Sequence, residues 1–134
     1  MTLNSSDRKT IINYRLEKAE NTFSEAVYSY EGGHFNLAIN RLYYSLFYAV
    51  TALLLSEQFN TTTHAGAKSM FHLHFVKNNI FNPEEGNLYN RLLQMRNTGD
   101  YDDFFNYTLE DVETLISPVK SLLNKIIAII NTKI

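Results

Sequence analysis

The chain has no cysteine, no long apolar run and no excess of charge of one sign. Without cysteine it can form neither disulfides nor metal sites built on thiolates, which suits a reducing cytosol. Its longest purely apolar runs, residues 126–130 and 52–55, are far shorter than the roughly 20 residues of a membrane-spanning helix. The polar residues 1–8 lack the apolar core of a secretory signal. We therefore expect a cytoplasmic protein that is not inserted in a membrane.

The charge of the chain is nearly balanced, with 12 Lys and Arg against 14 Asp and Glu, a net charge of −2 and a pI near 6.1. No basic stripe is visible, which argues against a dedicated duplex-binding protein. Contact with nucleic acid would have to be local, small or supplied partly by a partner. The 134 residues, 45% hydrophobic and 19% charged, predict a single globular domain over residues 1–134.

Apolar residues recur at the three-or-four spacing of a helix face in five segments, and no segment reads convincingly as a strand. The predicted helices span about residues 7–30, 34–58, 64–79, 82–98 and 108–130. The second segment is apolar nearly all round, so we expect it to be the central, buried helix. Short connections between long helices favour antiparallel neighbours, so the sequence predicts an all-α, up-and-down bundle of four to five helices.

Several residues predict where these helices begin, end or bend. Gly32 and Gly33 are expected to end the first helix, and Gly99 to end the fourth. The fourth begins with an N-cap, a proline and a glutamate in residues 82–85, a variant of the capping box. Pro118 lacks a backbone donor, which predicts a kink or a break in the fifth helix near residue 117.

Motifs of standard enzyme classes and metal sites are missing from the sequence. There is no glycine-rich phosphate loop, no HExxH zinc motif and no GxSxG elbow. Glu31 and His34 match the Glu-x-x-His motif of di-iron bundles once, within a glycine turn, whereas such a site needs two motifs. His72 and His74 are two residues apart, so a helix points them in different directions. We expect no metal site and no cofactor.

The first cluster of possible functional residues is the aromatic run that follows Arg41 in residues 41–48. Aromatic side chains combine a large apolar area with polar tips, so packing in the core and at an interface is the favoured interpretation. The alternative is a surface on which Arg41 and Tyr44 contact a base or a phosphate.

The second cluster surrounds Arg96 in the last turn of the fourth predicted helix. In one interpretation Arg96 interacts with the negative helix end and pairs with Asp100 or Asp102. In the other, its guanidinium lies at the rim of a groove and binds a phosphate through two donors. Tyr101 would then offer a hydroxyl within hydrogen-bond reach. The residue types leave both interpretations open.

Taken together, these segments resemble the small stand-alone prokaryotic members of the HEPN (higher-eukaryote and prokaryote nucleotide-binding) superfamily, from about residue 15 to residue 112. The resemblance is carried by three stretches in a fixed order, Asn40-Arg41-Leu42-Tyr43-Tyr44 with Phe47, then Thr63-His64, then Arg96-Asn97-Thr98-Gly99-Asp100-Tyr101-Asp102. It implies a helical bundle that commonly forms a homodimer. It also implies a possible minimal nucleotidyltransferase partner, as in toxin–antitoxin pairs.

Many members of the family are metal-independent ribonucleases. Their motif is an arginine, usually a polar residue after it, and a histidine four to six residues onward, and a dimer brings two motifs together in a cleft. Arg96 and Asn97 match this motif, but Tyr101 stands in the place of the histidine. A tyrosine, with a reference pKa of about 10, is a poor general base at neutral pH. The aspartates at 100, 102 and 103 would repel an RNA backbone.

The leading hypothesis is therefore a dimeric HEPN module that binds a nucleotide, RNA or a nucleotidyltransferase partner, without strong catalysis. The ligand or partner would bind through a groove around Arg96 and Tyr101. The candidate catalytic residues are Arg96, Asn97 and Tyr101, and the candidate ligand-binding residues are Arg41, Tyr44, His64 and Asp100. One alternative is a ribonuclease toxin in which Tyr101 or His64 replaces the usual base. Another is a purely structural dimer. Whether the protein is an enzyme stays open, and the sequence fixes no distance between His64 and the groove.

Overall fold

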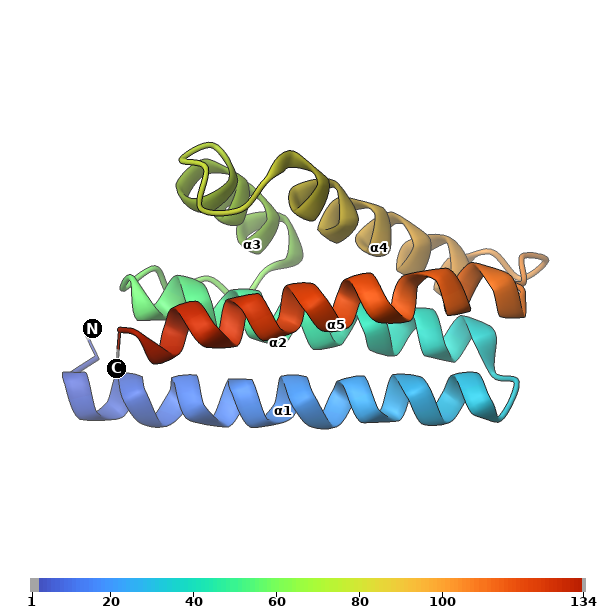
Figure 1. The fold of residues 1–134 in the computed structure, drawn as a ribbon, viewed down its shortest axis with the longest axis horizontal. Helices are drawn as coiled ribbons and strands as arrows, with labels where there is room; N and C mark the ends of the chain where they lie inside the picture. The colour runs from blue at the N-terminus through green and yellow to red at the C-terminus, as the bar shows by residue number, and fades with distance from the viewer. Residues whose placement is uncertain (1–2, 134) are drawn as a thin grey trace.

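The computed structural model describes residues 3–133, which form a bundle of helices without a strand in that range. The elements are α1 (Ser5–Glu31), α2 (Phe35–Ser56), α3 (His64–Phe71), the short π-helical turn η1 (His72–Val76), α4 (Pro83–Tyr101) and α5 (Leu109–Asn131). The four long helices α1, α2, α4 and α5 alternate in direction, and α3 and α4 lie together above the other three (Figure 1). The predicted all-α, up-and-down bundle is confirmed.

Helix α2 is the centre of the bundle, as its apolar residues predict. It packs against α1, α3, α4 and α5. Small residues let α1 approach closely, and the Ser45 hydroxyl donates a hydrogen bond of 2.8 Å to the Ala19 carbonyl inside this contact. Among the described helices, α2 is long and apolar enough to cross a membrane, yet 72% of the qualifying stretch is buried inside the bundle. Burial of this kind is how the core helix of a soluble protein behaves.

The predicted starts of α4 and α5 are confirmed in detail. Asn82 Oδ1 accepts from the Glu85 backbone N–H at 2.8 Å, and Glu85 Oε1 accepts from the Asn82 N–H at 2.8 Å. Thr108 and Asp111 form the same reciprocal box at the start of α5. Gly33 has a φ of 80° in the turn that ends α1, a conformation that glycine adopts without steric cost.

The predicted helix end at Gly99 is wrong, and of the predicted kink or break near residue 117 the break does not occur. Helix α4 continues through Gly99, because this glycine serves a close contact and not a helix end. A Cβ added to Gly99 would lie 3.1 Å from Cε2 of the Tyr107 ring. Helix α5 continues through Pro118 without a break. The carbonyl that loses its partner there belongs to Thr114, which lies on the exposed side of α5, where water can replace the missing donor.

Candidate functional site

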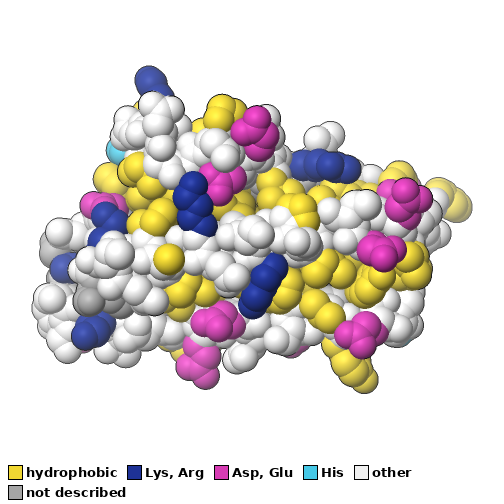
Figure 2. All heavy atoms as spheres, viewed as in Figure 1, with side chains coloured by type: hydrophobic (Ala, Val, Ile, Leu, Met, Phe, Trp, Pro, Cys, Tyr) yellow, Lys and Arg dark blue, Asp and Glu magenta, His cyan; other side chains and the backbone are white. Residues whose placement is uncertain are grey.

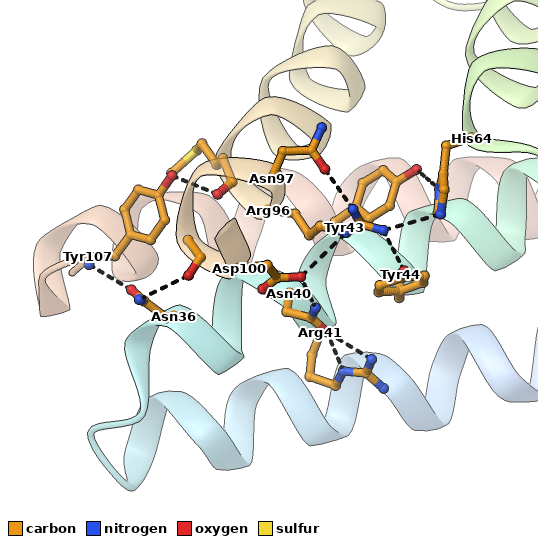
Figure 3. Close-up of polar contacts among 12 residues, drawn as sticks. Asn36, Asn40, Arg41, Tyr43, Tyr44, His64, Arg96, Asn97, Asp100 and Tyr107 are labelled. Carbon is orange, nitrogen blue, oxygen red and sulfur yellow. Dashed lines mark hydrogen bonds and ion pairs between the residues drawn. The ribbon is translucent and has the colours of Figure 1, made fainter. Parts of the chain in front are cut away.

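Arg96 lies near the end of α4 and is only 7% exposed, with its guanidinium turned toward α2 and α3 (Figure 3). Its Nη2 donates to the Tyr44 hydroxyl at 2.5 Å and to His64 Nε2 at 3.2 Å. Its Nη1 donates to Asn97 Oδ1 at 2.6 Å. Asp100 adds a carboxylate whose Oδ2 is 3.6 Å from Nε. We call these five residues the Arg96 site, and three helices contribute to it.

A polar row on α2 fixes the end of α4 beside this site. Asn36, Asn40 and Tyr44 are spaced by four residues and so share one face of an otherwise apolar helix. Asn40 Nδ2 donates to Asp100 Oδ2 at 2.9 Å. Asn36 accepts from the Tyr107 backbone N–H at 2.8 Å and donates to the Phe105 carbonyl at 3.0 Å. These contacts determine where α4 ends and therefore where Arg96 points.

His64 reaches the site from the first residue of α3. Its ring centroid lies 4.6 Å from that of Phe47, and its Nδ1 lies 2.7 Å from the Tyr43 hydroxyl. An arginine can only donate, so Nε2 of His64 must accept from Arg96 and the ring proton resides on Nδ1. Burial, followed by the charge of Arg96, lowers the pKa of His64 from its usual value near 6.5. His64 is therefore a neutral base at pH 7.

The rings of Tyr43 and Tyr44 pack against the Arg96 guanidinium. Burial raises the pKa of Tyr43 to about 12, so its hydroxyl stays protonated against His64. The rings of Tyr43 and Tyr44 have their centroids 5.5 Å and 5.1 Å from the guanidinium carbon of Arg96. Aromatic faces attract cations, so these rings help to hold the guanidinium in place.

Not every N–H donor of the Arg96 guanidinium makes a hydrogen bond within the described residues. The group carries five N–H donors, of which Tyr44, His64 and Asn97 accept three. Its Nε is buried and has no hydrogen-bond partner among the residues that the structure describes. Asp100 Oδ2, 3.6 Å from Nε, is too far away for a hydrogen bond, so this buried charged donor is only partly satisfied by its ion pair.

Comparison with known proteins places the chain in a family. The model of the HEPN domain matches residues 12–130. The chain belongs to the HEPN family. It is 33% identical over 121 residues to a protein of Thermotoga maritima named "UPF0332 protein", a match that covers 90% of this chain and 92% of that protein.

Two archaeal proteins are also similar to this HEPN chain. The "Putative toxin MJ0142" of Methanocaldococcus jannaschii is 34% identical over 110 residues, which are 82% of this chain and 75% of that protein. The "Putative toxin MJ0605" of the same organism is 29% identical over 122 residues, with 91% and 90% coverage. The expected relationship to small HEPN proteins is confirmed, and the names of these two archaeal proteins describe them as putative toxins.

The structure of this HEPN domain brings most of the predicted site residues together, but not all. Arg41 lies at the edge, where it stacks 5.3 Å from the Tyr44 ring and donates to Asn40 Oδ1. Tyr101 is 76% exposed and makes no hydrogen bond to Arg96 within residues 3–133. The hydroxyl beside Arg96 comes instead from Tyr44. The sequence analysis did not assign Tyr43 a site role, although its place one residue before Tyr44 was visible.

The charge around the HEPN site is uneven along the chain. Residues 58–99, which include α3 and most of α4, contain four Lys and Arg against two Glu. The remaining residues contain eight against twelve. Asp100, in the last turn of α4, reduces the excess to one positive charge for the whole α3–α4 layer, in a chain whose net charge is −2. This excess favours an anion on that layer.

Proposed function

We propose that this HEPN protein binds the phosphate of a nucleotide or of RNA at the Arg96 site, without strong catalysis. The observation that supports this most is the Arg96 guanidinium, whose Nε has no hydrogen-bond partner in the described part of the chain and only a 3.6 Å ion pair with Asp100. Guanidinium groups bind phosphate oxygens through two parallel donors, and such charge-assisted bonds are about twice as strong as neutral ones. Asn97 and Tyr44 would keep the guanidinium oriented while the ligand binds.

Opposite substitutions at the site provide the test. Calorimetric titration with AMP should show binding to the wild type, and Arg96→Gln should abolish it because the cation is lost. Asp100→Asn should tighten binding several-fold, because the carboxylate 3.6 Å from Arg96 Nε competes with phosphate. Asp103→Asn, in the exposed loop after α4, is the matched control and should change affinity little.

Comparing Arg96→Gln with Asp100→Asn also distinguishes a role of Arg96 in ligand binding from a role in stability. Arg96→Gln can lower stability, so its melting temperature must be measured beside its affinity. Asp100→Asn gains affinity and cannot be mistaken for unfolding. If neither variant alters AMP or RNA binding and Arg96→Gln only lowers the melting temperature, Arg96 is a structural residue and the proposal is wrong.

We further propose that the protein acts as a homodimer or in complex with a nucleotidyltransferase. The support is a group of aromatic residues at the end of α4 and in the loop that follows. Tyr101, Phe104 and Phe105 are exposed, Phe104 to 97%. Figure 2 shows hydrophobic side chains gathered over the α4–α5 side of the molecule, with acidic side chains near them. Exposed apolar groups of this kind mark protein interfaces. Light scattering on the wild type and on Phe104→Ser should show a loss of mass for the variant if the protein is a homodimer, and a monomer in both would contradict the homodimer.

A ribonuclease toxin is the second candidate, and the neutral His64 is the observation that favours it. Once Arg96 Nη2 turns from His64 to the phosphate, the freed Nε2 could accept the proton of a ribose 2′-hydroxyl while the 2′-oxygen bonds to phosphorus and the 5′-oxygen leaves. Arg96 would stabilise the charge on the phosphate, and the Tyr44 hydroxyl could protonate the leaving oxygen. Two similar proteins are named putative toxins.

Ribonuclease activity can be tested separately from binding. RNA cleavage in the presence of EDTA, and growth arrest on expression, should both disappear in His64→Asn while Tyr101→Phe retains them. Cleavage that survives His64→Asn would exclude His64 as the base. The absence of cleavage of any tested RNA, with Arg96-dependent binding retained, would leave the binding module as the function.

A further inference from the structure

An open polar pocket lies beside the Arg96 site, between α3 and α4. Its volume is about 540 Å³. Two cations and four carboxamides contribute to its lining, Lys68, Arg91, Asn87, Asn90, Gln94 and Asn97. The pocket shares Asn97 with the Arg96 site but is otherwise made of different residues. No carboxylate lines it.

The four carboxamides form a row along α4. Residues 87, 90, 94 and 97 are separated by steps of three, four and three, which places them on one face of the helix. Residues 86–99, which contain the row, include no acidic residue that would repel a phosphate. A single carboxamide can pair with the edge of a base through its donor and its acceptor, and this row offers four such groups.

Two members of the row are oriented by neighbours outside the pocket. His72 Nε2 lies 2.9 Å from Asn90 Oδ1, so the oxygen is occupied and the amide nitrogen remains for a ligand. Asn97 Oδ1 accepts from Arg96, and Figure 3 shows its amide nitrogen pointing away from the guanidinium. Neither nitrogen has a hydrogen-bond partner among the described residues. Oriented amides lose less entropy when a ligand binds.

The two cations of the pocket are available to an anion. Lys68 on α3 and Arg91 on α4 are exposed, and neither forms a salt bridge within residues 3–133. Elsewhere Lys125 and Arg41 are paired with Glu85 and Glu25. Lysine and arginine side chains supply most contacts to nucleic-acid phosphates.

We propose that this pocket binds one nucleotide unit, with Lys68 and Arg91 on its phosphate and the carboxamide row on the edge of its base. The inference rests on the proposed function, because Asn97 joins the two sites and a strand that leaves the pocket would reach Arg96. The unit can belong to a free nucleotide or to single-stranded RNA, and the probes below separate these sources. The pocket would then supply base preference to a site whose arginine reads only phosphate.

A direct test is to follow the side-chain amide signals of Asn90 and Gln94 by NMR while AMP, inorganic phosphate or a ten-nucleotide single-stranded RNA is added. AMP and RNA should shift both signals, and phosphate alone should shift them much less. A response to RNA alone would assign the unit to a strand, whereas a response to both would assign it to any nucleotide. No shift with any probe, or an equal shift with phosphate, overturns the inference.

Matched variants connect these signals to affinity. Replacing both cations, Lys68→Ala and Arg91→Ala, should weaken RNA binding for all sequences alike and lower the salt slope by about 0.7, the contribution of one neutralised phosphate on a single strand. Lys77→Ala, an exposed lysine that does not line the pocket, should change neither. Gln94→Ala should change the order of affinity among oligonucleotides of different base.

The outcomes distinguish this inference from the proposed function. If AMP still shifts Asn90 and Gln94 in Arg96→Gln, the pocket binds nucleotides even though the Arg96 site fails. If AMP binding depends on Arg96 but the Lys68 and Arg91 variants bind with wild-type affinity, the pocket is overturned and the proposed function stands. An unchanged base preference in Gln94→Ala refutes the role of the carboxamide row.

Discussion

The hydrogen bond between Arg96 and Tyr44 is the contact whose removal tests the site geometry most simply. Tyr44→Phe deletes one hydroxyl and retains the ring under the guanidinium. Arg96 is 7% exposed, so water cannot readily replace the lost acceptor at Nη2. A hydrogen bond to a charged group contributes about 1.5–3 kcal/mol, and the variant should lose about 2 kcal/mol of the free energy of unfolding.

Urea denaturation followed by circular dichroism measures this loss. With a slope of about 2 kcal/mol per molar, 2 kcal/mol corresponds to a midpoint lower by about 1 M. Tyr48→Phe is the matched control, because Tyr48 lies one turn further along α2 and its hydroxyl makes no hydrogen bond in the described structure. It should change stability by less than about 0.5 kcal/mol. Equal midpoints for Tyr44→Phe and Tyr48→Phe would refute the assignment of Tyr44 as the partner of Arg96.

Three further predictions concern glycine geometry and pH. Gly33→Ala should lower the free energy of unfolding by about 1 kcal/mol in urea denaturation, because a φ of 80° strains any residue with a Cβ. The added methyl group would have no atom within 4 Å, so it gains no packing contact that offsets this strain. Gly66→Ala should weaken AMP binding in calorimetry more than it lowers the melting temperature, because its Cβ would lie 2.6 Å from Thr63 Oγ1 and displace the cap beside His64. The lowered pKa of His64 means that the unfolded chain takes up a proton first, so stability is complete above about pH 6.5 and falls as the pH drops through the folded pKa. His64→Gln should lose this dependence in melting curves, whereas the exposed His34→Gln should keep it.

The helices and their caps could be predicted because their signals are local. The capping box of Asn82 and Glu85 and the apolar periodicity of α2 involve residues within a few positions of one another. The role of Gly99 could not be predicted in this way. Its sequence context is typical of a helix end, and only the tertiary approach of Tyr107 shows that the missing Cβ makes room for a ring.

The sequence analysis predicted which residues belong to the candidate site better than it predicted how these residues contact one another. Arg96 and Asn97 followed from the resemblance to the HEPN family, and their adjacency is local. His64 is 32 positions from Arg96, and its distance depends on how α3 packs on α2, which no local pattern encodes. The exposure of Tyr101 depends likewise on where α4 ends. The row of Asn36, Asn40 and Tyr44 was visible as polar residues on an apolar helix and could have indicated the face that meets α4.

The affinity of single-stranded RNA for Arg96→Lys tests the central claim most directly. Lysine keeps the positive charge but cannot offer the fork of donors that holds a phosphate and Asn97 together. We predict that the folded variant, verified by its melting curve, binds RNA at least about tenfold more weakly than the wild type, which corresponds to about 1.4 kcal/mol. An affinity equal to that of the wild type in a folded variant would contradict the claim that Arg96 binds phosphate through its guanidinium.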